Sequence, residues 1–123
     1  LASTDEEIDS LVMSMVTDPQ RIRKDDPGNP DVCNVYAWHR LFGASEAEVS
    51  EIFTGCTTAT LGCVADKRAL AERVKGVVRP IRERREELMQ DPGRLEAILE
   101  EGAEKARAIA APVMAEAIAA MGL

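Results

Sequence analysis

Apolar residues recur every three or four positions along most of the chain, a period typical of amphipathic helices. Ser3 and Glu6 precede the first of these runs at the spacing of a capping box. Prolines and a glycine then interrupt the period and predict a long loop. The pattern predicts helices over residues 4–16, 31–42, 45–55, 64–89 and 92–121, with loops over 17–30 and 56–63.

These elements predict an all-α fold: a small helical bundle with a long, kinked, basic helix and a long C-terminal helix. Aromatic residues make up only 3% of the chain against 46% hydrophobic residues, so the core must consist of aliphatic side chains. A length of 123 residues indicates one domain over 1–123. Pro80 predicts the kink in the basic helix. The predicted core face of that helix consists of Leu70, Val74, Val77, Ile81 and Leu88.

The formal net charge is −7, yet eight of the 15 basic residues lie between 67 and 85. Part of this group falls on one edge of the predicted helix, about opposite its apolar stripe, where it could contact the phosphates of a nucleic acid. The alternative is a solvated face balanced by neighbouring carboxylates. The candidate phosphate contacts are Arg68, Lys75, Arg79 and Arg82, with a secondary group of Arg21, Arg23 and Lys24 in the long loop.

Three cysteines, Cys33, Cys56 and Cys63, are spaced C-x22-C-x6-C, and Asp66 follows at a further x2 spacing. An odd number of cysteines argues against a disulfide framework, which leaves a metal site or buried free thiols. No apolar run approaches the length of a membrane span, and the first residues are acidic. We therefore expect a cytoplasmic protein with no membrane partner.

Several runs of residues closely resemble the C-terminal helical part of bacterial tryptophanyl-tRNA synthetases, and the resemblance as a whole covers nearly all of the chain. These runs are Val12–Pro19, Arg21–Val35, Gly62–Val64, Pro80–Arg85 and Glu101–Ala110. The resemblance implies recognition of the anticodon arm of tRNA(Trp) by a class I tryptophan-tRNA ligase. The Rossmann domain of such an enzyme, with its HIGH and KMSKS signatures, would precede Leu1.

Neither catalytic signature is present here, and the chain begins with Leu1 rather than methionine. We therefore expect a fragment, or a free-standing relative, that performs no catalysis unaided. The resemblance assigns ATP and magnesium to the full-length enzyme only, and it implies a homodimer for that enzyme. The partners it implies for this chain are tRNA(Trp) and the missing Rossmann domain.

One branch of the resembled family holds a four-iron four-sulfur cluster with the pattern C-x22-C-x6-C-x2-C. Cys33, Cys56 and Cys63 match three positions of that pattern, and Asp66 stands where the fourth cysteine would be. Carboxylate oxygen is a harder ligand than thiolate, so the fourth iron would be bound by Asp66 or left open. The alternative is a lineage that has lost the cluster and keeps three buried thiols.

Two other functions remain open at this point. One is a small iron-sulfur or redox-sensing protein built on the same domain, and the other is a protein-interaction role for the acidic last helix. His39, the only histidine, is expected to be a helix-face residue that makes one hydrogen bond. The alternative is a replacement metal ligand, at a position that the pattern of the resembled family does not use.

Overall fold

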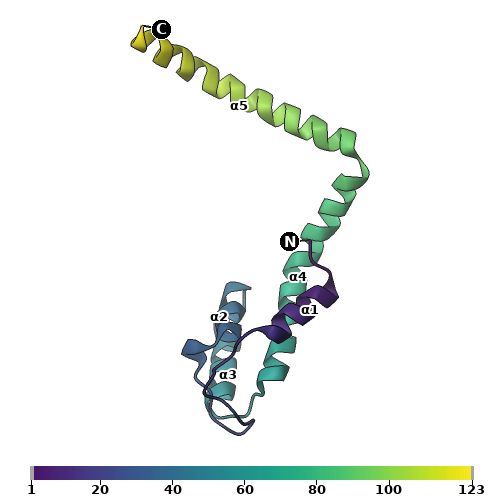
Figure 1. The fold of residues 1–123 in the computed structure, drawn as a ribbon, viewed down its shortest axis with the longest axis vertical. Helices are drawn as coiled ribbons and strands as arrows, with labels where there is room; N and C mark the ends of the chain where they lie inside the picture. The colour runs from purple at the N-terminus through teal and green to yellow at the C-terminus, as the bar shows by residue number, and fades with distance from the viewer. Residues whose placement is uncertain (1, 123) are drawn as a thin grey trace. The chain divides into compact units, whose positions relative to one another are not determined.

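The computed structural model describes residues 2–122, and every regular element within them is helical (Figure 1). This confirms the predicted all-α fold. Among the described helices, none combines the length and hydropathy needed to cross a bilayer. The elements are α1 (Asp5–Ser14), the short 3₁₀ helix η1 (Pro30–Val32), α2 (Asn34–Leu41), α3 (Glu46–Thr57), α4 (Cys63–Gln90) and α5 (Pro92–Met121).

The cap of the first helix is Thr4, one residue later than the predicted Ser3. The Thr4 hydroxyl accepts a hydrogen bond from the Glu7 backbone N–H at 3.2 Å, and the Glu7 carboxylate accepts one from the Thr4 N–H at 2.9 Å. The predicted Ser3 cap was therefore wrong, because the neighbouring threonine and glutamate have the same spacing. The capping box of α3, formed by Ser45 and Glu48, is confirmed.

The loop predicted over 56–63 is shorter than expected, because α3 continues through Gly55 and includes Cys56. Gly55 permits a close approach here: a Cβ on it would lie 2.8 Å from the Cβ of Leu61. The Leu61 N–H also donates to the Gly55 carbonyl at 2.9 Å. Ala59 makes the turn with a φ of 59°, and α4 then begins at Cys63.

Both long helices were predicted almost to the residue. Helix α4 continues through Pro80, and the Asp91 carboxylate caps α5 by accepting a hydrogen bond from the Arg94 N–H at 3.0 Å. Gly122 ends α5 in the left-handed region, with a φ of 73°, a conformation that glycine adopts without steric cost.

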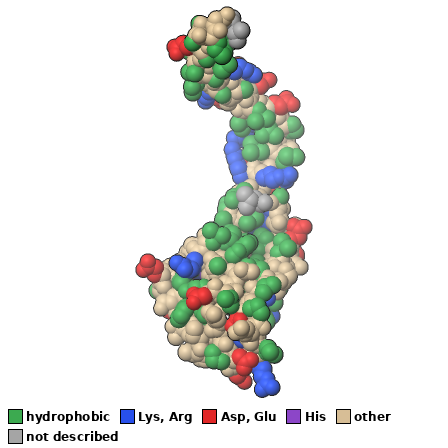
Figure 2. Space-filling view, turned by 60° about the vertical axis from the view of Figure 1, so that its left-hand side comes forward, with side chains coloured by type: hydrophobic (Ala, Val, Ile, Leu, Met, Phe, Trp, Pro, Cys, Tyr) green, Lys and Arg blue, Asp and Glu red, His purple; other side chains and the backbone are tan. Residues whose placement is uncertain are grey.

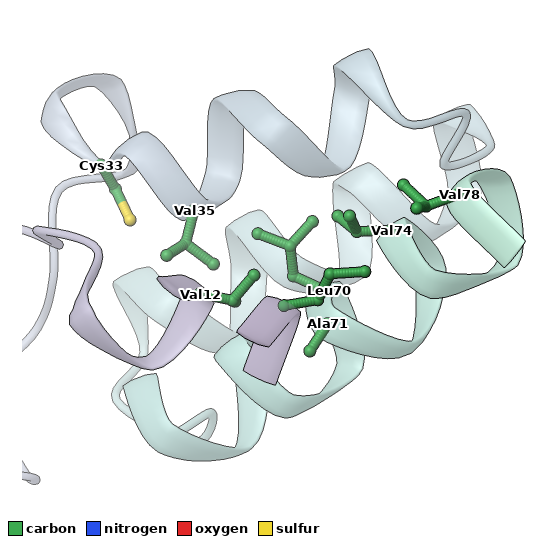
Figure 3. Close-up of a cluster of buried hydrophobic side chains, with 8 residues drawn as sticks. Val12, Cys33, Val35, Leu70, Ala71, Val74 and Val78 are labelled. Atoms are coloured by element: carbon green, nitrogen blue, oxygen red, sulfur yellow. The ribbon is translucent and has the colours of Figure 1, made fainter. Parts of the chain in front are cut away.

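The chain divides into two compact units, Leu1–Arg82 and Glu83–Leu123. The core of the first unit lies between α1, α2 and α4, where Val12 and Val35 point toward Leu70 (Figure 3). Leu70, Val35 and His39 are its most completely buried large side chains. The buried apolar residues are Ile8, Val12, Cys33, Val35, Leu70, Ala71, Val74 and Val78.

The buried face of α4 differs from the predicted one. Leu70 and Val74 are buried as expected, but Val77 and Ile81 remain 44% and 41% exposed. Ala71, Lys75 and Val78 take the buried positions in their place. The helix has turned its basic edge toward α1, whose carboxylates bind the cations there, as described below.

The second unit contains the end of α4 and all of α5. None of its described residues is buried, and apolar side chains of α5 lie on its surface (Figure 2). The large exposed ones on α5 are Ile98, Leu99, Ile109, Val113, Met114, Ile118 and Met121.

Candidate functional site

Three cysteines that are far apart in the sequence line one small pocket of the first unit. Cys33 comes from the end of η1, Cys56 from the last turn of α3 and Cys63 from the first turn of α4. Asp66 lies one turn beyond Cys63 on the same helix. We call this the cysteine pocket; its lining is Thr17, Asp18, Arg21, Cys33, Cys56, Leu61, Cys63 and Asp66.

A guanidinium group lies against two of the sulfur atoms. Arg21 Nη1 donates to Cys63 Sγ at 3.6 Å and, more weakly, to Cys56 Sγ at 4.0 Å. Its Nη2 donates to the Lys24 carbonyl at 2.8 Å, which holds the side chain in this position. Burial raises the pKa of the Cys56 thiol, and the Arg21 charge offsets part of that effect.

The long loop before η1 is fastened to this pocket at two points. The buried Asp18 accepts hydrogen bonds from the N–H groups of Gln20 and Asn29, both at 2.8 Å, and so joins the two ends of the loop. Gly28 donates its N–H to the Cys56 carbonyl at 3.0 Å. A Cβ on Gly28 would lie 2.6 Å from Cys56 Sγ, so the glycine is what allows the loop to approach the sulfur.

The side chain of Asp66 lies next to that of a buried histidine of α2. His39 Nε2 of α2 lies 3.0 Å from Asp66 Oδ1, and both residues are buried, with 1% and 8% of their surface exposed. The separation is that of a hydrogen bond, but neither ring nitrogen of His39 has an aligned partner among the described residues.

The geometry of the pocket is not that of a site for one metal ion. Within residues 2–122, no group of three or more histidine, cysteine, aspartate or glutamate side chains is placed to hold a metal ion. The structure thus brings Cys33, Cys56, Cys63 and Asp66 to one pocket, as the resemblance implies, without testing whether they bind iron.

An open groove with a basic lining adjoins the cysteine pocket and shares Thr17, Arg21, Leu61 and Cys63 with it. The long loop forms one wall and the first turns of α4 form the other. We call it the basic groove; its lining is Thr17, Arg21, Ile22, Arg23, Lys24, Thr60, Leu61, Gly62, Cys63, Val64, Ala65 and Arg68.

Four of the seven predicted phosphate contacts line this groove: Arg21, Arg23, Lys24 and Arg68. The side chains of Arg23, Lys24 and Arg68 are exposed and form no ion pair with the carboxylates of residues 2–122. Their charges are therefore available to an anionic ligand without first breaking an internal contact.

The other three predicted contacts are bound to carboxylates of the chain itself. Arg79 donates to Asp5 Oδ2 from Nη2 at 2.6 Å, and Arg82 donates to Asp5 Oδ1 at 2.9 Å. Lys75 lies 2.7 Å from Asp9 and 2.8 Å from Glu72. These three cations fasten α4 to α1, so a phosphate would have to compete with an existing partner.

Sequence reasoning missed two residues that shape the site, Asp18 and Gly28, and did not predict the burial of a third, His39. Asp18 precedes a proline, and that position often carries an aspartate that caps its own turn, so a signal was present. Gly28 was interpreted only as a helix breaker. His39 was predicted to be a helix-face residue, and its burial depends on α4, which lies far along the chain.

No family model matches this chain, but known proteins similar to it include aminoacyl-tRNA ligases. More narrowly, these relatives are tryptophan–tRNA ligases. The ligase of Aquifex aeolicus is 45% identical over 118 residues, which cover 96% of this chain and 30% of the relative. That of Thermotoga maritima is 39% identical over 123 residues, which cover 100% and 38%.

A solved structure supports the same relationship. The crystal structure of tryptophanyl-tRNA synthetase from Campylobacter jejuni, complexed with ADP and tryptophan, superposes with a TM-score of 0.81 at 30% sequence identity. The match covers 99% of this chain and 37% of that one. The chain therefore spans about a third of the length of the ligases that it resembles.

Proposed function

We propose that this chain is the helical, tRNA-binding part of a tryptophan–tRNA ligase, that it recognises the anticodon arm of tRNA(Trp), and that it acts in the cytoplasm. The observation that carries the proposal is similarity to such ligases over nearly the whole chain, at up to 45% identity among those described above. The alternative of a small iron-sulfur or redox-sensing protein receives no support from these relatives.

The basic groove is the surface that we assign to the RNA. An anticodon arm presents phosphates and unpaired bases, which proteins bind with cations and flat side chains. Arg23, Lys24 and Arg68 offer unpaired charges along this groove. Lys75, Arg79 and Arg82 remain candidates, but their ion pairs make them secondary to the groove residues.

Salt dependence of binding tests this assignment. Three phosphate contacts to a single-stranded arm imply a slope of log K against log salt of roughly −2, at about −0.7 for each contact. Arg68→Gln should make the slope shallower by about 0.7, because one contact is lost. The measurement is fluorescence anisotropy with a labelled tRNA(Trp) anticodon stem-loop.

Arg107→Gln supplies the matched control, since Arg107 is an exposed arginine of α5 that lies outside the groove. It should leave the slope unchanged. If Arg68→Gln keeps the wild-type slope while Arg79→Gln reduces it, the binding surface lies on the edge of α4 and not in the groove.

We further propose that aminoacylation requires the rest of a full-length ligase, whose Rossmann domain would supply the tryptophan and ATP sites and whose own assembly would be a homodimer. The chain alone should then show no tryptophan-dependent exchange of pyrophosphate into ATP. Exchange above that of a buffer blank, with this chain as the sole protein, would overturn this part of the proposal.

The cysteine pocket is the second site to which we assign a ligand, an iron-sulfur cluster of the four-iron type. Three sulfur donors and one carboxylate line it, and this donor set suits cluster iron. The Arg21 N–H groups that face two sulfurs also fit, because hydrogen bonds to sulfur stabilise cluster thiolates. When bound, the cluster would supply either electron transfer or a fixed charge beside the groove.

Anaerobic reconstitution with iron and sulfide tests the cluster. Wild-type protein should take up iron and turn brown, whereas Cys56→Ser should not, because it removes one of three thiolates. Thr57→Ser is the control, a neighbouring substitution outside the pocket lining. Wild-type protein that stays free of iron after careful anaerobic handling would show that the three thiols serve only to pack the core.

A further inference from the structure

The contact between His39 and Asp66 is unusual because it places a carboxylate and an imidazole together in the core. His39 is among the three most completely buried side chains of the first unit. Its Nε2 lies 3.0 Å from Asp66 Oδ1, and neither Nε2 nor Nδ1 makes an aligned hydrogen bond within the described part of the chain. Burying such groups is costly unless a specific interaction compensates them.

The position of Asp66 at the start of α4 does not by itself explain this burial. A carboxylate in the first turn of a helix interacts favourably with the helix dipole, but it does so equally well at an exposed position. Asp66 instead turns toward the cysteine pocket, which it lines together with Cys63, three residues earlier on the same face of α4. It therefore stands between a buried histidine on one side and three sulfur atoms on the other.

We propose that His39 is a positioning residue that holds Asp66 in the cysteine pocket as the oxygen ligand of the cluster. This rests on the cluster proposed above. A hydrogen bond from His39 Nε2 to Oδ1, which lies 3.0 Å away, would leave Oδ2 for iron, and the histidine would then favour ligation by Asp66 over an open iron. Ligating carboxylates are commonly oriented by such an outer partner, whose removal weakens metal affinity about 10- to 100-fold.

The test compares how fast the reconstituted protein loses its fourth iron. Anaerobic samples of wild type, His39→Leu and His39→Gln are exposed to air, and the three-iron form is followed by electron paramagnetic resonance. Loss should be about tenfold faster in His39→Leu, which has no donor for Asp66. His39→Gln retains an amide N–H near the position of Nε2, so it should stay within about threefold of wild type.

A double-mutant comparison separates positioning from a general structural effect. In the Asp66→Cys background the fourth ligand is a thiolate that needs no histidine, so adding His39→Leu should leave the rate of iron loss unchanged. Equal acceleration in both backgrounds would overturn the proposal, and so would a wild-type rate in His39→Leu.

Folding and iron content are also measured for each variant. Circular dichroism establishes that each variant is folded; if His39→Leu is not, His39→Asn replaces it, since its shorter amide also fails to reach Asp66. If wild type and Asp66→Cys both remain without iron, the cluster itself is absent, which refutes the proposed cofactor as well. If wild type and Asp66→Cys both hold iron, but His39→Leu and His39→Gln lose it at the same rate, the cluster is present and His39 does not position Asp66.

Discussion

Gly28 shows how a single residue can fix the architecture of the cysteine pocket. Its N–H donates to the Cys56 carbonyl, and the space where a side chain would begin is already filled by Cys56 Sγ at 2.6 Å and Arg21 Cδ at 3.2 Å. The loop can lie against the end of α3 only because this position has no Cβ.

Gly28→Ala should therefore destabilise the protein. Forcing Cys56 and Arg21 apart costs about 1–3 kcal/mol, which exceeds the gain of about 0.4–1 kcal/mol from a less flexible unfolded chain. Urea denaturation followed by circular dichroism would measure the difference. Gly62→Ala is the control, because nothing lies within 4 Å of a Cβ there; equal stability of the two variants would contradict the argument.

The site could be predicted from the sequence only where its residues match the pattern of the resembled family. That match implied one shared site for Cys33, Cys56, Cys63 and Asp66, whereas their spacing alone is a weak signal. The contact of His39 with Asp66 depends on how α2 packs against α4, and residue spacing holds no information about that contact.

At the scale of helices, the attachment of α1 to α4 explains why the predicted core face was misplaced. A helical wheel of α4 alone puts its cations opposite the apolar stripe and assigns them to solvent. The carboxylates of α1, more than sixty residues earlier, bind those cations instead: Asp5 binds Arg79 and Arg82, and Asp9 binds Lys75. The period predicted the helices correctly, but their rotation is set by these partners.

The Asp5 ion pairs should make stability depend on pH in acid. Hydrogen bonds from Arg79 and Arg82 lower the pKa of Asp5 from 3.8 to about 2. Because the folded-state pKa is lower than the unfolded one, the stabilisation is fully present above about pH 4 and is lost as the pH falls from 4 toward 2. Asp5→Asn removes this contribution.

At low ionic strength, the thermal midpoint of wild type should thus exceed that of Asp5→Asn at pH 6. The difference between the two midpoints should shrink toward zero as the pH falls to 2. Asp25→Asn, at an exposed loop position with no ion pair among the described residues, is the control and should show no such closing gap. A gap that stays constant between pH 6 and pH 2 would mean that Asp5 does not hold α1 through its charge.

At the scale of the whole chain, the buried residues and most of the exposed apolar side chains of the long helices lie in different segments. Every buried residue among those described lies between Ile8 and Val78, whereas α5 presents apolar side chains over much of its length (Figure 2). The sequence pattern predicted α5 as an amphipathic helix but could not say what covers its apolar face.

A chain shortened to residues 1–90 tests this division. It keeps the buried core, the cysteine pocket and the basic groove, so its thermal midpoint and its salt slope for the anticodon stem-loop should match those of the full chain. The full chain should self-associate as its concentration rises, because exposed apolar patches promote association. The shortened chain should remain monomeric in sedimentation equilibrium. A large fall in thermal midpoint on shortening would show instead that α5 stabilises the first unit.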